Sequence, residues 1–534
     1  MCQPTPNNAV IITIDAGTTG VRAFAVDLDG LPVGRSYREF TQYFPQPGWV
    51  EHDAAEIWSV TQTVIHELVT TLGRTVAAIG ITAQRETIVV WNRQTGTPLH
   101  AAIVWQDRRT AQRCEQLEAQ GELPKIRSLT GLVLDPYFSA SKIEWLLTQG
   151  KVTVDADMLL GTIDTWILWN LTGGASHRTD PSNACRTMLF DIRTGAWSED
   201  LCELFGVPVS ALPEVHPSAG SFGTTVAGSG LPAGIPITGI AGDQQAALFG
   251  QACVQPGMAK NSYGTGSFVL MNVGSTCPEP TEGLLTTVAW TLPARMISAS
   301  GKDSASGKDS ASGKDSASGK DSASGKDSAG LVTHYALEGS IFATGAAVQW
   351  LRDGLGIIQE AAEIGPLAAS VADSGGVVMV PAFAGLGSPY WDPYARGAVL
   401  GITRGSGRAE LARAVVEAMA YQTRDVVDAM SAASGTQLEE LRVDGGASVM
   451  PLLLHLQADQ LGVRVLRNSV AETTALGASY LAGLGAEVWS NVSEVSQNWH
   501  ADAQVEPSAD RSAAEAGYAQ WLRGVERSRG WAPD

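Results

Sequence analysis

A short loop rich in glycine and threonine near the start of the chain could bind an anionic ligand. Asp15 follows the apolar run Val10–Ile14, and a glycine, Thr18 and Thr19 come next. Glycine lets the backbone approach a ligand closely, and threonine hydroxyls with free N–H groups can bind phosphate oxygens. Arg22 adds a guanidinium that could hold a phosphate through two hydrogen bonds. Taken alone, these residues would also fit a hairpin turn with a capping aspartate.

Charged residues also follow two other apolar segments. Arg85 and Glu86 come after a predicted strand at 76–82, and a buried pair of this kind can offer hydrogen bonds to a hydroxylated substrate. Asp243 follows a glycine-containing apolar segment, where an aspartate in a cleft could be a general base or a metal ligand. The alternative interpretations are a solvated ion pair at Arg85-Glu86 and a helix N-cap at Asp243, because 244–249 is helix-prone.

Two more glycine loops occur in the second half of the chain. They are Gly264-Thr-Gly266 and Asp444-Gly-Gly446, each after a short apolar run. Either loop alone is typical of an ordinary turn. Together with the loop at Asp15, they make three loops suited to phosphate or nucleotide, which the turn interpretation does not predict.

The elements that must position these loops are repeated along the chain. Predicted strands at 10–14 and 21–26 and a third strand beginning near Leu31 form a meander, and 54–72 is a predicted helix. The second half opens the same way, and its predicted elements are strands at 259–263, 268–273 and 441–444 and helices at 408–431 and 449–461. The repetition predicts two related α/β domains, 1–248 and 249–534, facing a cleft that binds the ligands.

A low-complexity segment interrupts the second half. From residue 301 the unit Gly-Lys-Asp-Ser-Ala-Ser is repeated five times, the last copy cut short, without any aromatic or branched apolar residue. Such a composition cannot bury enough surface to order itself, so we predict a disordered surface loop at 292–332. Its glycine spacing, and the aspartate after each lysine, do not fit a P-loop.

Composition excludes several classes of protein. The chain has 534 residues with 36 basic and 55 acidic side chains, a net charge of −19 that disfavours nucleic-acid and anionic-membrane partners. No run of 18 apolar residues predicts a membrane span, and the N-terminus carries no pattern of an export signal. The six cysteines are scattered without a CxxC pair, so we expect reduced thiols in a cytoplasmic protein.

The motifs as a set resemble the FGGY family of carbohydrate kinases, from Ile11 to about Trp489. Residues 137–149 fit one long family signature, and 397–417 contain the second. The stretches most similar to the members that act on glycerol are Gln84-Arg-Glu-Thr87, 102–110, Asp135-Pro-Tyr-Phe138 and 242–250. The resemblance implies two actin-like, ribonuclease-H-like α/β domains flanking an active-site cleft. It also implies ATP-dependent phosphorylation of glycerol to sn-glycerol 3-phosphate.

The same resemblance assigns roles to individual residues. Asp243 takes the role of general base, and Asp15 and Asp243 take that of Mg²⁺ ligands. The substrate-binding positions are Arg85, Glu86, Trp105, Tyr137, Asp243, Gln244 and Phe268. The ATP-binding positions are Thr18, Thr19, Arg22, Thr265, Gly345, Gln349, Gly446 and Met450.

Three departures from the family pattern bear on nucleotide binding. Ala16 and Gly20 stand where relatives usually carry glutamine and serine, which predicts the loss of one phosphate contact. Met450 replaces an asparagine that helps to hold the nucleotide base, which predicts a changed affinity for adenine. The resemblance further implies a homo-oligomer, dimer or tetramer, with a small-molecule substrate.

Two alternative functions stay open at this stage. The first is a kinase of the same family for another polyol or ketose, such as erythritol, dihydroxyacetone or xylulose. The bulky Trp105, Tyr137 and Phe268 speak against the wider pocket that these substrates need. The second is an actin-like ATPase that switches a protein partner, although the pairs Arg85-Glu86 and Asp243-Gln244 have no obvious use there.

Overall fold

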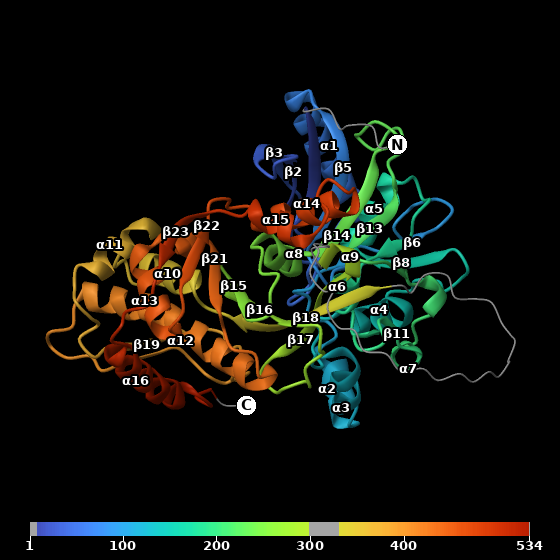
Figure 1. The fold of residues 1–534 in the computed structure, drawn as a ribbon. Helices are drawn as coiled ribbons and strands as arrows, with labels where there is room; N and C mark the ends of the chain where they lie inside the picture. The colour runs from blue at the N-terminus through green and yellow to red at the C-terminus, as the bar shows by residue number, and fades with distance from the viewer. Residues whose placement is uncertain (1–7, 298–329, 533–534) are drawn as a thin grey trace, which may run out of the picture.

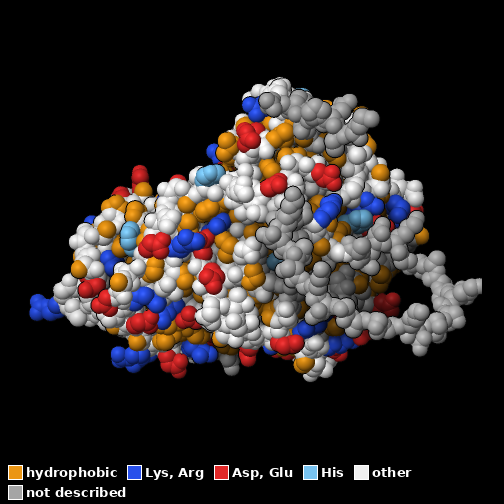
Figure 2. Space-filling model, viewed as in Figure 1, with side chains coloured by type: hydrophobic (Ala, Val, Ile, Leu, Met, Phe, Trp, Pro, Cys, Tyr) orange, Lys and Arg blue, Asp and Glu red, His pale blue; other side chains and the backbone are white. Residues whose placement is uncertain are grey.

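The computed structural model describes residues 8–297 and 330–532, which form two lobes (Figure 1). Within those ranges, no helix combines the length and the apolar character that a bilayer crossing requires. On the face drawn in Figure 2, Lys and Arg side chains are interspersed with Asp and Glu, and no single basic patch is visible there.

A six-stranded sheet forms the centre of the first lobe, in the order β13-β14-β5-β1-β2-β3. β1, β2 and β3 form an antiparallel meander, whereas β1, β5 and β14 run parallel. The predicted strands at 10–14, 21–26 and 76–82 are confirmed, each extended by one or two residues at its ends. The bounds are β1 Ala9–Ala16, β2 Gly20–Asp27, β3 Pro32–Glu39, β5 Thr75–Ala83, β13 Ala219–Thr224 and β14 Pro236–Gly242.

Both faces of this sheet are covered by helices, which explains why β1 is a continuous apolar run. Ile12 packs in one buried cluster with α1 (Ala54–Leu72). Ile11, on the opposite face, packs in another cluster with α8 (Asp243–Gly250) and α14 (Thr473–Gly485). Helix α14 comes from the far end of the sequence, so the second half of the chain covers part of one face of the first sheet.

Helix α1 begins and ends where the sequence predicts. The carboxylate of Asp53 accepts hydrogen bonds from the backbone N–H groups of Ala55 and Glu56, which satisfies donors of the first turn. Gly73 ends the helix at a φ of +57°, in the left-handed region that glycine adopts without strain. Capping residues on either side therefore fix the bounds 54–72.

A smaller four-stranded sheet, in the order β4-β7-β6-β8, adjoins the first one. Three of its strands belong to the segment between β5 and β14, the fourth, β4, comes just before α1, and short helices cover the sheet. Its elements are β4 Glu51–His52, β6 Ile88–Asn92, β7 Ala102–Ile103, α2 Ala111–Ala119, α3 Leu123–Thr130, α4 Ser139–Thr148, β8 Met158–Thr162, α5 Ile163–Leu171, α6 Pro181–Ala184 and α7 Glu199–Leu204.

A seven-stranded sheet forms the centre of the second lobe, in the order β17-β18-β16-β15-β21-β22-β23. The meander β15-β16-β18 is antiparallel, and β15, β21 and β22 run parallel. This repeats the arrangement β3-β2-β1-β5-β14 strand for strand, as expected for two ribonuclease-H-like domains, and the predicted fold class is confirmed. The bounds are β15 Met258–Tyr263, β16 Ser267–Gly274, β17 Leu285–Pro293, β18 Leu331–Ile341, β21 Glu440–Gly445, β22 Val465–Asn468 and β23 Ala501–Val505.

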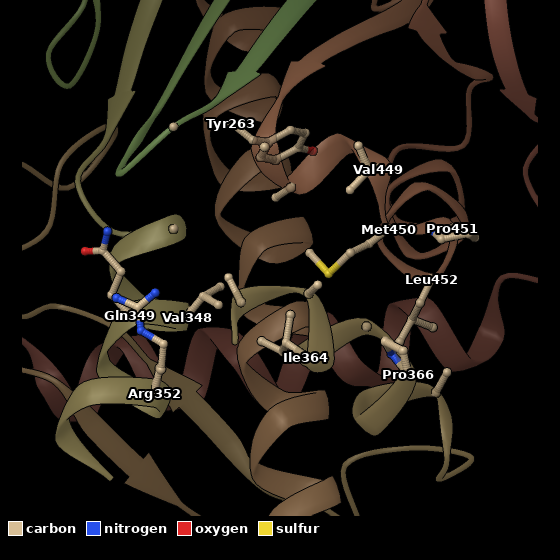
Figure 3. A pocket seen from close by; sticks show the side chains of 18 of the residues that line it. Tyr263, Val348, Gln349, Arg352, Ile364, Pro366, Val449, Met450, Pro451 and Leu452 are labelled. Carbon is tan, nitrogen blue, oxygen red and sulfur yellow. The ribbon is translucent and has the colours of Figure 1, made fainter. Parts of the chain in front are cut away.

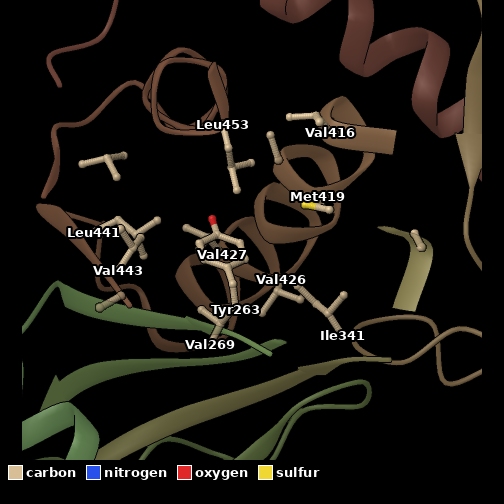
Figure 4. Close-up of a cluster of buried hydrophobic side chains, with 14 of the residues drawn as sticks. Tyr263, Val269, Ile341, Val416, Met419, Val426, Val427, Leu441, Val443 and Leu453 are labelled. Carbon is tan, nitrogen blue, oxygen red and sulfur yellow. The ribbon is translucent and has the colours of Figure 1, made fainter. Parts of the chain in front are cut away.

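Helix α12 (Arg408–Ser434) fills the core of the second lobe, where Met419 and Val426 lie among the side chains around Tyr263 (Figure 4). The predicted helix at 408–431 is confirmed, and its apolar side chains face the core: Leu411 is partly buried, and Val415, Met419, Val426 and Met430 are buried. The other helices of this lobe are α10 Gly345–Gln349, α11 Ile364–Ala369, α13 Pro451–Leu461 and α16 Ser512–Ser528, whereas α15 Val492–Gln497 packs in the cluster that contains Ile11 and α14.

The predicted loop at 292–332 is wrong at both ends. β17 continues to Pro293, α9 spans Ala294–Ile297, and β18 begins at Leu331. β17 and β18 stay paired up to Pro293 and Leu331, so their cross-strand hydrogen bonds continue almost to the repeats. The rest of that predicted loop, 298–329, lies outside the described residues.

Glycines let α8 and α14 approach each other where the two lobes meet (Figure 1). A Cβ on Gly477 would lie 1.8 Å from the carbonyl oxygen of Ala246, and one on Gly250 would lie 2.0 Å from that of Thr473. Real Cβ atoms do not come so close to backbone atoms. The contact between these helices therefore depends on glycine at both positions.

Replacing Gly477 by alanine should destabilise the protein. The added methyl group would push α14 away from α8, and overpacking of this kind costs about 3 kcal/mol. Urea unfolding of Gly477→Ala would measure the loss, with Thr474→Ala on the same helix as a control that changes stability little. Equal stabilities of the two variants would contradict the described packing.

Candidate active site

Three parallel strands of the first sheet end side by side at one edge. The last residues of β1, β5 and β14 are cross-strand partners. Asp15 is the next-to-last residue of β1, Arg85 and Glu86 follow closely after β5, and Asp243 follows directly after β14. Ligands of α/β sheets bind at the carboxyl ends of such strands. The fold thus collects four of the predicted charged residues at one edge.

Asp15 is a buried carboxylate paired with an arginine. Arg22 Nη1 donates to Asp15 Oδ2 at 2.9 Å, across the register of β1 and β2. Burial raises the pKa of Asp15 from 3.8 to about 6, Arg22 opposes that rise, and the charge of Asp243 adds to it. The two aspartates that the sequence predicts as metal ligands therefore influence each other.

Thr18 and Thr19 form the turn between β1 and β2. The indole Nε1–H of Trp105 donates to Thr18 Oγ1 at 3.0 Å, and the Gln42 amide donates to the Thr18 carbonyl at 3.0 Å. Since the Thr18 hydroxyl accepts from Trp105, its own proton stays free to donate. The turn thus keeps a donor for an anion and contacts a predicted substrate residue.

Arg85 is the centre of a buried ion network. Its Nη1 lies 2.6 Å from Glu338 Oε2, and its Nε lies 3.1 Å from Asp243 Oδ1. Its Nη2 donates to the Tyr137 hydroxyl at 3.4 Å. Burial opposes the charge of Arg85, but the carboxylates of Glu338 and Glu86 hold its pKa above the ordinary value. A charged guanidinium therefore touches both the predicted base and a predicted substrate residue.

A second buried arginine closes this network. Arg186 Nε lies 2.7 Å from Glu86 Oε1, and its Nη2 lies 3.1 Å from Glu338 Oε1. Burial disfavours the ionised Glu338 carboxylate, yet Arg186 and Arg85 lower its pKa to about 2. Two arginines and two glutamates balance one another, which makes their burial tolerable. Neither Arg186 nor Glu338 was among the residues predicted from the sequence.

Glu86 has an unusual backbone conformation at this site. Its φ is +63°, in the left-handed region, and its side chain is buried. Burial raises the pKa of Glu86, while Arg85 and Arg186 oppose that rise. A strained non-glycine residue inside a charged cluster is typical of a functional site.

Asp243 is the first residue of α8, and Gly242 is the residue that caps the helix, so the N-cap interpretation is wrong. β14 runs directly into the helix, and a Cβ on Gly242 would lie 2.8 Å from Arg85 Cδ, so no larger cap fits. The Asp243 carboxylate is 29% exposed and stays accessible to a ligand. Its position suits a base that receives a proton from the cleft.

Gln244 is held by a lysine that sequence reasoning missed. Lys260 Nζ donates to Gln244 Oε1 at 2.5 Å and to Ser262 Oγ at 3.0 Å. Burial lowers the pKa of Lys260. The lysine comes from β15, so it ties the start of α8 to the central sheet of the second lobe.

A cavity of about 790 Å³ contains the other predicted substrate residues. Trp105 and Tyr137 meet edge to face with ring centroids 5.5 Å apart. The predicted substrate residues that line this cavity are Trp105, Tyr137, Gln244 and Phe268.

A buried lysine holds the backbone of the loop that carries Tyr137. Lys142 Nζ donates to the carbonyl oxygens of Pro136, Tyr137 and Phe138 at 2.7 to 2.8 Å. Burial lowers the pKa of Lys142 to about 8. The three hydrogen bonds hold the Tyr137 backbone in place, so Lys142 is a positioning residue for this cavity.

A second cavity, of about 720 Å³, contains five of the predicted ATP-binding residues (Figure 3). Met450 points toward Ile364 across it, and Val348 adds to its apolar wall, whereas Gln349 and Arg352 lie together at another side. The predicted residues that line it are Thr265, Gly345, Gln349, Gly446 and Met450.

Glycine and threonine loops join the two cavities. Gly264 and Thr265 line both of them. β15 and β21 run parallel, with Tyr263 and Gly445 as cross-strand partners, so the loops that follow them lie side by side. A nucleotide in one cavity could therefore present its phosphates to a hydroxylated substrate in the other.

A magnesium ion would find two carboxylates here, those of Asp15 and Asp243. Among residues 8–297 and 330–532, no group of three or more His, Cys, Asp or Glu could hold a metal ion by itself. Mg²⁺ is usually held by one or two carboxylates together with water and substrate phosphates. The pair therefore fits a metal that arrives with a nucleotide.

The repeated sheets and the paired cavities are those of a two-lobed protein of the actin-like class. The FGGY family of carbohydrate kinases matches this chain twice, its N-terminal domain over residues 10–250 and its C-terminal domain over 259–486. The chain belongs to the FGGY family of carbohydrate kinases.

Several known proteins are similar over nearly the whole length. A glycerol kinase of Trichlorobacter lovleyi is 51% identical over 98% of this chain and 99% of its own, and one of Symbiobacterium thermophilum is 49% identical over 99% and 100%. A glycerol kinase of Plasmodium falciparum, solved with ADP, is 32% identical with a TM-score of 0.87 over 98% and 99% of the two chains.

Replacing Asp15 by asparagine should stabilise the protein near neutral pH. Because the folded pKa lies near 6 and the ordinary value is 3.8, ionising Asp15 costs the folded state stability as the pH rises between these values. Two pKa units correspond to about 3 kcal/mol. Urea unfolding should give this gain near neutral pH and almost none at about pH 4.

A loss of stability in Asp15→Asn near neutral pH would contradict this account of the site. Activity provides the second readout, because the variant should lose most of its turnover while gaining stability. Ser36→Ala, on β3 of the same sheet, is a control that should not combine a gain in stability with a loss of turnover.

Proposed function

We propose that this chain transfers the γ-phosphoryl group of ATP to a terminal hydroxyl of glycerol, giving sn-glycerol 3-phosphate. The observation that carries the proposal is the contact of Arg85 with both Asp243 and Tyr137, next to cavities that meet at Thr265. Two relatives about half identical over nearly the whole chain, both glycerol kinases, support the same substrate.

Binding comes first in the proposed mechanism. Arg85 and Glu86 offer hydrogen bonds to the glycerol hydroxyls, and Trp105 and Phe268 pack against its carbon chain. A buried charged network can hold such polar contacts in one geometry. Tyr137 completes the set, because its hydroxyl is already oriented by Arg85.

Proton transfer and phosphoryl transfer follow. Asp243 accepts the proton of the terminal hydroxyl as its oxygen bonds to the γ-phosphorus, and the bond from that phosphorus to the bridging oxygen of ADP breaks. Arg22 and the hydroxyls of Thr18 and Thr19 stabilise charge on the transferring group. Mg²⁺ held near Asp15 and Asp243 would neutralise phosphate charge.

Three further features belong to this proposal. We keep the division into domains 1–248 and 249–534, each built on one of the two central sheets. We also keep a cytoplasmic homo-oligomer, dimer or tetramer, without nucleic-acid partners. We also propose that Met450, where relatives carry an asparagine, changes the affinity for adenine. Its position in the lining of the cavity of Figure 3 supports this role.

A substrate panel tests the proposal against its alternatives. ATP-dependent turnover is measured with glycerol, dihydroxyacetone, erythritol and xylulose. The proposal predicts the highest kcat/KM for glycerol. A higher value for another substrate would favour a different polyol or ketose kinase, and ATP hydrolysis independent of all four would favour an actin-like switch protein.

Asp243→Asn should reduce kcat about a thousandfold, because an amide cannot accept the hydroxyl proton. The overall fold should be retained, as judged by circular dichroism. Asp29→Asn, in an exposed turn, is the matched control and should keep normal turnover. Turnover of Asp243→Asn close to that of the control would refute the assignment of the base.

A further inference from the structure

A row of three side chains crosses the meander of the first sheet. Asp15 of β1 is the register partner of Arg22 of β2, and Arg22 is the partner of Tyr37 of β3. Partners in neighbouring strands share a face of the sheet. Ser36 and Arg38, which flank Tyr37, instead contact Glu67 of α1 on the other face. Tyr37 therefore lies on the same face as the Asp15–Arg22 pair.

The Tyr37 hydroxyl reaches the phosphate-suited turn itself. It lies 3.4 Å from Thr19 Oγ1, and a Cβ on Gly20 would come within 2.7 Å of it. The Arg22 guanidinium carbon lies 5.6 Å from the centre of the tyrosine ring. The phenol thus occupies the space that a side chain at position 20 would need.

This turn has few other groups to hold an anion. Arg22 is already paired with Asp15 at 2.9 Å, which offsets part of its charge. Ala16 and Gly20 carry no polar side-chain atom, and the chain as a whole has a net charge of −19. A phenol hydroxyl can donate to a phosphate oxygen, and Tyr37 is 43% exposed, so a ligand can reach it.

We propose that the Tyr37 hydroxyl is a further phosphate-binding group of the nucleotide site. It acts beside Thr18, Thr19 and Arg22, and it supplies the donor that Ala16 and Gly20 cannot. The inference rests on the proposed function for the identity of the nucleotide. The position of the Tyr37 hydroxyl follows from the cross-strand pairing of Asp15, Arg22 and Tyr37 and from its contact with Thr19.

Tyr37→Phe removes the hydroxyl and leaves the ring in place. Titration calorimetry with Mg²⁺ and a non-hydrolysable ATP analogue should give about tenfold weaker binding, the usual effect of one hydrogen bond to a charged group. Binding of AMP, which lacks the outer phosphates, and the KM for glycerol should stay within twofold of the wild type.

Tyr43→Phe is the matched control, because Tyr43 is also 43% exposed and its hydroxyl lies 3.5 Å from Glu56 Oε2, a different environment. Its affinity for the analogue should not change. Unchanged affinity in Tyr37→Phe, or equal weakening of AMP binding, would overturn the proposal. A wild type that binds the analogue but does not phosphorylate glycerol would instead count against the proposed function alone.

Discussion

The buried network of Arg85, Arg186, Glu86 and Glu338 is the constraint on which the site depends. Three members come from the first half of the chain and Glu338 comes from β18 of the second. Removing one member would leave an unpaired buried charge, and this would destabilise the folded state far more than the loss of an exposed ion pair does. The network therefore fixes Arg85 against Asp243 only while the two lobes are assembled, so substrate binding is coupled to their assembly.

Much of the fold could be predicted from local patterns. β1 is a continuous apolar run because helices cover both faces of its sheet, and α1 is bounded by a capping aspartate and a left-handed glycine. The repetition of meander and helices predicted two related domains, and the actin-like fold class and the FGGY family are confirmed. Residues at strand ends were good candidates for the site, because parallel strands bring their carboxyl ends together.

The parts that could not be predicted depend on contacts between distant segments. Glu338 is the charged residue of an otherwise largely apolar strand, which predicts a buried partner of opposite charge but not which residue it is. That partner, Arg85, lies 253 positions away in the sequence. Lys142 likewise holds the loop of Tyr137, and Lys260 holds the first turn of α8, at positions that only the fold determines. The bounds predicted for the repeat loop were wrong because strand pairing between β17 and β18 extends almost to the repeats, which composition does not reveal.

We infer that Glu338, from the second half of the chain, holds Arg85 for substrate binding. Calorimetric glycerol affinity of Glu338→Gln tests it most directly, with Glu440→Gln as control, since Glu440 is also buried and paired but with Arg442 and Arg464. We expect at least about tenfold weaker glycerol binding in Glu338→Gln and unchanged binding of an ATP analogue. Glycerol affinity equal to that of the control would contradict it.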